Sequence, residues 1–298
     1  MKIMKNLTQK NSPASQNGGF VLVLVLLVLA AILALAVDFA YGVYVNISGL
    51  HNLNTLQYLS VEGSSLIDSS SNVFLQALSS GNIPLNGQAM NIPVDDGTMV
   101  NFLAEDENAK FNLNSVVQPN GDLNQDAYKS FKRLLTALKL DTGIADKVAY
   151  WINPASAPQG ASGNEKYVKK GPLASTEELR LFIDEASYDT LKNYVTVYSD
   201  GLININTAQA PVLMSLSDQM TPDLADRVIE RRKLEPFKNI GELSLVAGFE
   251  KMGMALTPEI TVTSSAIRIT ASAQREGLDR TVECVMDPSG KVFFWRES

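Results

Sequence analysis

The chain opens with a polar stretch and then becomes strongly hydrophobic. Residues 1–19 contain three lysines and no acidic side chain, whereas residues 20–37 contain neither a charge nor a strongly polar group. At 1.5 Å per residue, a helix of this length matches a hydrocarbon core roughly 30 Å thick. The pattern therefore predicts one membrane-spanning helix, with its lysine-bearing start in the cytoplasm.

The helical pattern continues beyond the hydrophobic run. Apolar residues recur at spacings of three and four from Leu50 to Leu78, and no proline lies between Pro13 and Pro84. This spacing predicts an amphipathic continuation of the same helix. We therefore expect a transmembrane and stalk helix over residues 20–80, ending near a glycine that suits a C-terminal cap.

Segments with strand character lie at both ends of the remaining chain. Turn residues separate them, in particular an Asp-Asp-Gly sequence at 95–97. The predicted strands cover residues 89–94, 98–104, 267–271, 281–286 and 292–295. We expect one antiparallel sheet, whose first part lies in residues 81–110 and whose last part lies in residues 259–298.

The segment between these strands, residues 111–258, carries mainly helical signals. Helices are expected over residues 126–140, 145–152, 175–183 and 221–233. Residues 111–115 and 203–207 share an Asn-x-Asn pattern, which indicates either two related helical units or a chance match. The predicted fold is α+β, with a long N-terminal helix packed on an antiparallel sheet and a large helical domain inserted in it.

Charge and rare residue types limit the chemistry of the chain. After residue 19 it has 22 basic against 32 acidic residues, which argues against a general nucleic-acid binder. Cys284 is the only cysteine and His51 the only histidine, so an intrachain disulfide is excluded and a Ser-His-Asp or Cys-His site is disfavoured. No phosphate-binding G-x-x-x-x-G-K-[ST] loop occurs. We expect no enzyme.

The junction between the polar and hydrophobic stretches resembles the leader of type IV prepilins. The resemblance implies that residues 1–19 are a leader, that a prepilin peptidase cuts between Gly19 and Phe20, and that Phe20 is then N-methylated. Most pilin-like proteins carry glutamate at the fifth mature position, where this chain has Leu24. That glutamate is thought to neutralise the N-terminal amine of the neighbouring subunit above. A simple single-pass anchor is the alternative.

The absence of that glutamate has an electrostatic consequence. A charge without a partner in an apolar core costs several kcal/mol or more, so each buried amine needs a carboxylate. A subunit with Leu24 brings no carboxylate and needs no neighbour above it. It can still offer its own amine to the subunit below. We therefore expect Leu24 to place this chain at the top of a stack.

A broader resemblance covers nearly the whole chain, and it is to the minor pseudopilin K (GspK) family of type II secretion systems. It rests on the order of several motifs: Gly19-Phe20, Leu24, Asn112-x-Asn114, Trp151-Ile152, Glu165 with Tyr167, residues 175–179 and residues 204–237. The family implies a pilin-like fold and a place at the pseudopilus tip. The implied location is the inner membrane, with the soluble part in the periplasm.

The same resemblance implies partners. These are two smaller minor pseudopilins (I- and J-like), the major pseudopilin, the prepilin peptidase and the inner-membrane assembly platform. Some members also bind calcium through acids after the tryptophan motif and a following glutamate. Here Glu165 is retained, but residues 153–156 lack the acids, and calcium needs several oxygen ligands. Residues 120–126 are read as a turn and helix cap rather than an EF-hand.

One further resemblance leaves a different function open. Residues 204–243 are similar to the helix-hairpin-helix DNA-binding module of competence proteins, in which a Gly-x-Gly turn approaches a phosphate. This chain has Met220, Thr221 and Pro222 at that place, and proline removes one backbone donor. The alternatives to a pseudopilin are thus a minor pilin of a type IV pilus or a membrane-tethered DNA receptor.

Overall fold

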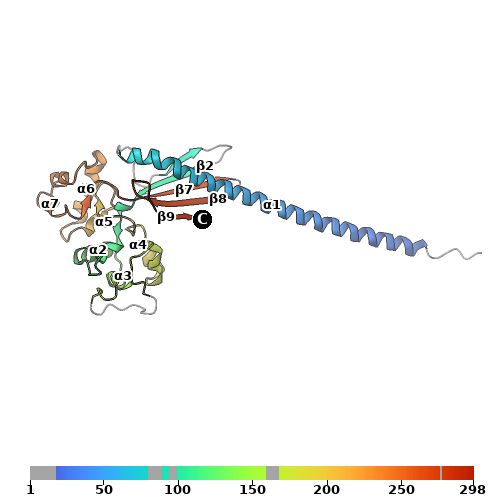
Figure 1. The fold of residues 1–298 in the computed structure, drawn as a ribbon, viewed down its shortest axis with the longest axis horizontal. Coiled ribbons are helices and arrows are strands. Elements are labelled where there is room, and N and C mark those ends of the chain that lie inside the picture. The colour runs from blue at the N-terminus through green and yellow to red at the C-terminus, as the bar shows by residue number, and fades with distance from the viewer. Residues whose placement is uncertain (1–17, 80–88, 94–98, 159–167, 276) are drawn as a thin grey trace, which may run out of the picture. The chain divides into compact units, whose positions relative to one another are not determined.

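The computed structural model describes residues 18–79, 89–93, 99–158, 168–275 and 277–298 (Figure 1). The chain divides into two compact units, one ending at Gln57 and one beginning at Tyr58. Helix α1 (Gly18–Ser79) supplies nearly all that is described of the first unit and continues into the second. This agrees with the helix expected over residues 20–80. The glycine expected to cap it, Gly81, lies outside the described residues.

The second unit contains a five-stranded antiparallel sheet in the order β1-β2-β7-β8-β9. Its strands are β1 (Met90–Pro93), β2 (Met99–Asp106), β7 (Ile267–Arg275), β8 (Leu278–Met286) and β9 (Val292–Glu297). All five strands expected from the sequence are present. The turn expected at residues 95–97 lies outside the described part of the chain.

Alternation along the strands explains where the core of the sheet forms. Side chains on one face are small or apolar, among them Phe102, Ile269 and Cys284, and Leu59 of α1 joins their buried cluster. The cysteine is thus a buried strand residue, as its surroundings predict.

Asp106 at the end of β2 lies directly opposite Ile267 at the start of β7. The 160 residues between them therefore leave the sheet and return to it at neighbouring positions.

That insert is mostly helical and has its own core, which includes Phe131, Leu213 and Phe249. It contains α2 (Gln125–Ala137), α3 (Ile144–Ile152), α4 (Glu185–Leu191), α5 (Ala210–Ser215), α6 (Pro222–Leu234), α7 (Met252–Ala255) and the 3₁₀ segments η2 (Glu107–Ala109), η3 (Leu113–Val116), η5 (Thr176–Leu181) and η6 (Ile240–Leu245). Asn124 caps α2, as the sequence predicts, by accepting a bond from the Ala127 N–H at 3.3 Å.

One of the expected helices differs in kind. Residues 175–183 form the 3₁₀ segment η5 rather than an α-helix, and Ser175 makes no capping bond with its side chain. Glu178 takes over part of that role, since its carboxylate accepts the Ala174 N–H at 2.7 Å and the Trp151 indole N–H at 3.1 Å. The bond from Trp151 links the segment to α3, whereas the bond from Ala174 is local. The local sequence predicts a helical segment here but not that it winds as a 3₁₀ helix.

Short parallel strand pairs frame the two halves of the insert. β3 (Phe111–Asn112) pairs with β4 (Val195–Thr196), and β5 (Ile203–Asn204) pairs with β6 (Ile260–Thr261). From the sequence we expect the last part of the large sheet to begin at residue 259, which would include residues 260–261. This boundary is wrong. The partner of β6 is β5, so residues 260–261 belong to the insert and the large sheet resumes only at β7.

Each half of the insert also contains a polar contact of the same kind. Asn114, just after β3, accepts the N–H of Leu173 at 2.8 Å and donates to its carbonyl at 3.0 Å. Asn206, just after β5, accepts the N–H of Phe237 at 2.8 Å and donates to its carbonyl at 2.9 Å. In both contacts an asparagine two residues after a short strand holds the loop that precedes a 3₁₀ segment. The Asn-x-Asn echo in the sequence therefore marks two similar structural units and is not a chance match.

Candidate functional site

The first candidate functional region is the N-terminal part of α1. Residues 22–61 are long and apolar enough to cross a membrane, judged by length and composition. Gly19 and Phe20, the predicted cleavage residues, lie in the first turn, which contains no acidic residue. Leu24 follows and is 53% exposed. An apolar surface of this extent is stable only in lipid or against other helices.

A group of aromatic side chains follows the hydrophobic run. Phe39, Tyr41 and Tyr44 are all exposed on α1, directly after Asp38, which is the first charged residue of the helix. Tyrosine is enriched where membrane helices meet the headgroup layer, because its ring is apolar and its hydroxyl is polar. The position of these residues indicates where the helix leaves the hydrocarbon.

The second candidate region is a network of charges between the sheet and the insert. Arg268 of β7 donates from Nε to Glu107 at 2.7 Å and from Nη1 to Glu283 of β8. Arg296 of β9 donates to Glu283 at 2.6 Å and to Glu177 of η5 at 3.2 Å. These five side chains, here called the junction cluster, connect three strands with both η2 and η5.

Glu107 is the most enclosed member of the junction cluster, with its side chain fully buried. Burial alone would raise the pKa of its carboxyl, but Lys110 and Arg268 hold that pKa below its ordinary value. The Thr196 hydroxyl of β4 also donates to it. The carboxylate therefore stays charged and connects β4, η2 and β7.

Aromatic rings cover one side of the same cluster. Tyr198 and Phe294 lie with their centroids 5.9 Å apart, and the Arg268 guanidinium lies 5.5 Å from the Tyr198 ring and 5.9 Å from the Phe294 ring. Burial raises the pKa of Tyr198 to about 12. The rings exclude water from Arg268, which strengthens its ion pairs. The junction cluster thus fixes the insert on the sheet.

A second buried carboxyl, Asp106, links the end of β2 to the second unit of the insert. It accepts bonds from the Asn204 amide at 2.7 Å, the Thr207 hydroxyl at 2.6 Å and the Asn108 N–H at 2.8 Å. Burial raises the pKa of Asp106 in spite of these donors. Its partners are all neutral, so it acts as a polar anchor rather than as an ion pair.

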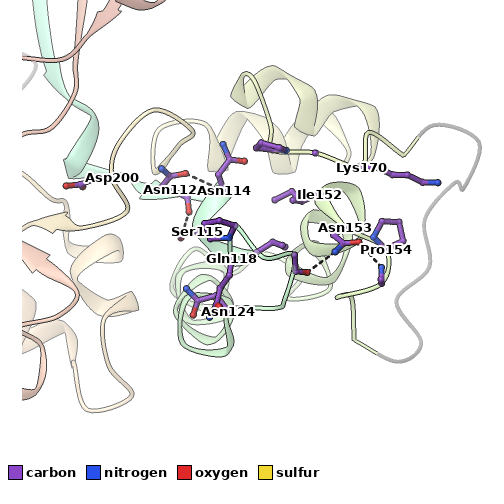
Figure 2. A pocket seen from close by; sticks show the side chains of 16 residues that line it. Asn112, Asn114, Ser115, Gln118, Asn124, Ile152, Asn153, Pro154, Lys170 and Asp200 are labelled. Atoms are coloured by element: carbon purple, nitrogen blue, oxygen red, sulfur yellow. Dashed lines mark hydrogen bonds between the residues drawn. The ribbon is translucent and has the colours of Figure 1, made fainter. Parts of the chain in front are cut away.

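A pocket of about 980 Å³ lies in the first half of the insert, the half that carries Asn114 (Figure 2). Asparagine side chains are prominent in its wall, but their polar atoms are already bound to the chain. Asn153 donates to the Gly121 carbonyl at 2.8 Å and accepts the Ala155 N–H at 3.1 Å. Asn114 is held by Leu173 in the same way. These bonds hold the Asn153 and Asn114 amides in place in the pocket wall.

The pocket also adjoins the stretch in which the family resemblance implies calcium ligands. The residues described after Trp151, from Asn153 to Ser156, contain no carboxylate, and Asn153 is engaged with the backbone. Glu165 lies outside the described residues. Among those that are described, no three His, Cys, Asp or Glu side chains gather as a metal site would require. The described part of this stretch does not fit calcium.

The hairpin between α5 and α6 tests the resemblance to DNA-binding modules. Thr221 caps α6 with its own hydroxyl, which accepts the Leu224 N–H at 3.3 Å. Arg232 turns inward and donates to the carbonyls of Ile205 and Ala208, both at 2.8 Å. Lys233 pairs with Glu230 at 2.7 Å. The basic end of α6 is thus used within the chain, which disfavours a phosphate-binding surface.

Comparison with known families completes this description. Residues 109–200 and 203–263 match two sequence models that are both described as type II secretion system (T2SS), protein K. Together the matches cover about half of the chain and almost all of the insert. The chain belongs to the type II secretion system protein K family. The boundary between the two matches falls between the two structural units that carry Asn114 and Asn206.

Individual members of the protein K family are also similar to this chain. Type II secretion system protein K of Pseudomonas aeruginosa is 31% identical over 162 residues, which cover 49% of this chain and 48% of that relative. The match thus spans about half the length of the relative. A solved GspK-GspI-GspJ complex from enterotoxigenic Escherichia coli contains a chain with a TM-score of 0.68 and 18% identity. It covers 85% of this chain and 99% of that one, and so shows the fold.

The protein K motifs in the sequence lead to the insert, and only one of them, residues 175–179, contains a member of the junction cluster. Glu177 belongs to a predicted helix start, whereas Arg268 and Glu283 appear only as polar residues that alternate in strands. Arg268 alternates with Ile267 and Ile269, which are both fully buried, so its side chain points to the opposite face of β7. This alternation gives no sign that Arg268 is itself enclosed. Its carboxylate partners are set by the tertiary fold.

Proposed function

We propose that this chain is a minor pseudopilin at the tip of the type II secretion pseudopilus. In this role it primes or caps filament assembly, for export of folded proteins across the outer membrane. The observation that carries the proposal is membership of the protein K family. The exposed apolar helix α1 supports it, since such a helix can serve as a membrane anchor and then pack in a filament core.

Processing and placement follow from the first turns of α1. A prepilin peptidase would cut after Gly19 and methylate Phe20, which leaves the apolar helix attached to the soluble part. Leu24 would then stand at the fifth mature position, where an acid would otherwise meet the amine of a subunit above. Because this position carries no charge, the chain needs no subunit above it. It is therefore a non-enzymatic building block for the top of the stack.

The partners and location belong to the same proposal. The solved E. coli structure contains a GspK-GspI-GspJ complex, and we infer corresponding I- and J-like partners for this chain. The major pseudopilin, the prepilin peptidase and the inner-membrane assembly platform complete the set. Before assembly, α1 crosses the inner membrane once, with the lysine-bearing residues 1–19 in the cytoplasm and the sheet and insert in the periplasm.

The first test is the intact mass and N-terminal sequence of the chain, made with and without an active prepilin peptidase. The expected product begins with methylated Phe20 only when the peptidase is active, and Gly19→Leu prevents the cut. Gly49→Ala is the matched control, because an added Cβ there meets no atom within 4 Å. A chain that starts at Met1 both with and without an active peptidase would overturn the filament proposal.

The placement is tested separately by Leu24→Glu. A carboxylate at this position should recruit a subunit above, so the variant should appear within filaments rather than at their ends, as seen by immunogold labelling. Leu26→Glu is the matched control, because it adds the same charge at a similarly exposed position of α1. If Leu24→Glu keeps the tip position, the electrostatic argument is wrong even if the chain is processed as expected.

A further inference from the structure

The outer edge of β9 exposes backbone groups that can pair with another strand. Within the described residues β9 is the last strand of the sheet and pairs with β8 alone. Thr281 and Ser298 exchange both backbone hydrogen bonds, each at 2.9 Å. Such bonded pairs alternate along an antiparallel ladder. The N–H and C=O groups of Trp295 and Glu297 therefore point away from the sheet.

The same edge carries apolar side chains that the chain itself leaves open to solvent. Phe293 is 42% exposed and Trp295 is 40% exposed, and Val292 beside them is exposed as well. Trp295 lies opposite Cys284 in the register, on the face of the sheet that packs against α1. The Ser60 hydroxyl of α1 donates to Glu297, so the edge runs beside this part of the helix.

The charged side chains along β9 already have partners within the chain. Arg296 belongs to the junction cluster. Glu297 lies 3.8 Å from Arg280 and accepts the Trp295 indole N–H at 3.2 Å. The Lys291 ammonium lies 5.3 Å from the centre of the Phe293 ring. The two charged side chains of β9 itself, Arg296 and Glu297, are therefore already paired, and the side-chain contacts that a partner adds at this edge should be mainly apolar.

Edge strands of monomeric proteins are usually protected against pairing, by proline, by charges that point along the edge or by irregular backbone. The other edge strand of this sheet, β1, is short and ends at Pro93. β9 contains no proline, and its one irregularity lies opposite Val285 and Met286, before the regular stretch that carries Trp295. The regular stretch of β9, from Phe294 to Glu297, is thus an open edge that carries Trp295, and Phe293 stands at the irregularity just before it.

We propose that the outer edge of β9 docks an extended segment of a neighbouring minor pseudopilin, as an added strand with apolar side chains at alternate positions. This inference rests on the proposed function, which supplies the neighbours. A strand is the fitting occupant because it satisfies the outward N–H and C=O groups while it covers Phe293 and Trp295. A helix or a lipid surface could cover the rings but would leave the backbone groups unpaired.

The test uses the full chain, co-expressed with the I- and J-like pseudopilins of its own secretion system and purified in detergent. The double variant Phe293→Ser, Trp295→Ser should recover at least about tenfold less of these partners than the unaltered chain. The matched control is Leu181→Ser, Leu245→Ser, which removes two leucines of the insert that are 69% and 84% exposed. The control should recover its partners normally.

Amide hydrogen exchange at single residues then distinguishes an added strand from simple side-chain contact. In the complex, the amides of Trp295 and Glu297 should become protected, whereas Arg296, which already bonds to β8, should change little. Unchanged partner recovery by the double variant, or a complex without protection at Trp295 and Glu297, would overturn the docking proposal and leave the proposed function intact.

Two further outcomes would also assign the edge differently. If the double variant loses only self-association, or only sedimentation with anionic phospholipid vesicles, the occupant is a second copy or the membrane, and the proposal is wrong. If the unaltered chain recovers neither pseudopilin, the proposed function itself fails. The experiment therefore separates the failure of the surface from the failure of the function.

Discussion

Removing Arg268 should destabilise the attachment of the insert more than any other single change in the junction cluster. Its side chain is 15% exposed and faces Glu107, which is fully buried, and Glu283. Loss of one partner of a buried ion pair costs about 3–5 kcal/mol, because the other charge stays buried. Lys110 remains 3.5 Å from Glu107, so we expect Arg268→Met to cost about 3 kcal/mol, near the lower end of that range.

The two tryptophans allow this cost to be measured in both parts of the structure. Trp151 lies in α3 of the insert and Trp295 in β9 of the sheet, and the chain contains no others. Urea unfolding of the full chain in detergent, followed by fluorescence in versions that keep one tryptophan each, reports the two parts separately. Arg268→Met should lower both midpoints, because the junction cluster couples the insert to the sheet.

A second variant tests whether the lost stability comes from the charge that Arg268→Met leaves buried. If the cost comes from leaving a charge buried, Arg268→Met combined with Glu107→Gln should regain much of the lost stability, to within about 1 kcal/mol of the parent chain. A loss of less than about 1 kcal/mol in the single variant would show that the ion pair adds little. A double variant less stable than the single one would show that Glu107 matters for packing rather than for charge.

Three further predictions concern other parts of the chain. Asn114→Ala and Asn206→Ala should each cost about 1–3 kcal/mol in urea unfolding, because each leaves backbone groups without partners. Gly248→Ala should lower the thermal midpoint of unfolding, and Gly290→Ala should lower it less. Both glycines have a positive φ, but at Gly248 an added Cβ would lie 2.7 Å from a leucine methyl. Stability should fall as the pH drops from about 7 to about 3, and the fall should be smaller in Glu107→Gln.

The sign of the pH effect follows from the lowered pKa of Glu107. A carboxyl with a lower pKa in the folded state stabilises that state above its unfolded pKa and loses this effect as protons bind. An acid loss of equal size in Glu107→Gln would assign the effect to other groups. Tolerance of Asn114→Ala but not Asn206→Ala would contradict equal roles for the two asparagines. Equal costs at Gly248 and Gly290 would contradict the steric argument.

The sequence is most informative where one physical pattern dominates. An apolar run followed by apolar residues at spacings of three and four predicts α1, and strand-forming segments bounded by turn residues predict the strands of the large sheet. Asn124 also caps α2 as expected, since a cap is a local interaction. These features need no knowledge of residues distant in the chain.

The parts that could not be predicted depend on distant partners. β6 is only two residues long and has meaning only beside β5. The bond from Trp151 to Glu178 of η5 joins two segments 27 positions apart. Arg268 reads as an ordinary polar strand residue until Glu107, 161 positions away, is placed next to it. Sequence alone shows which residues need partners, and the fold selects them.

The neighbouring positions of Asp106 and Ile267 have a consequence for how such a chain can change over time. For the sheet, the whole insert is equivalent to a hairpin loop, because it begins and ends at one cross-strand pair. The entropy cost of closing a loop rises only slowly with its length, so a much shorter or longer insert would leave the ladder intact. A subunit built this way can acquire, exchange or lose an inserted helical domain without redesign of the sheet and of the helix that packs on it.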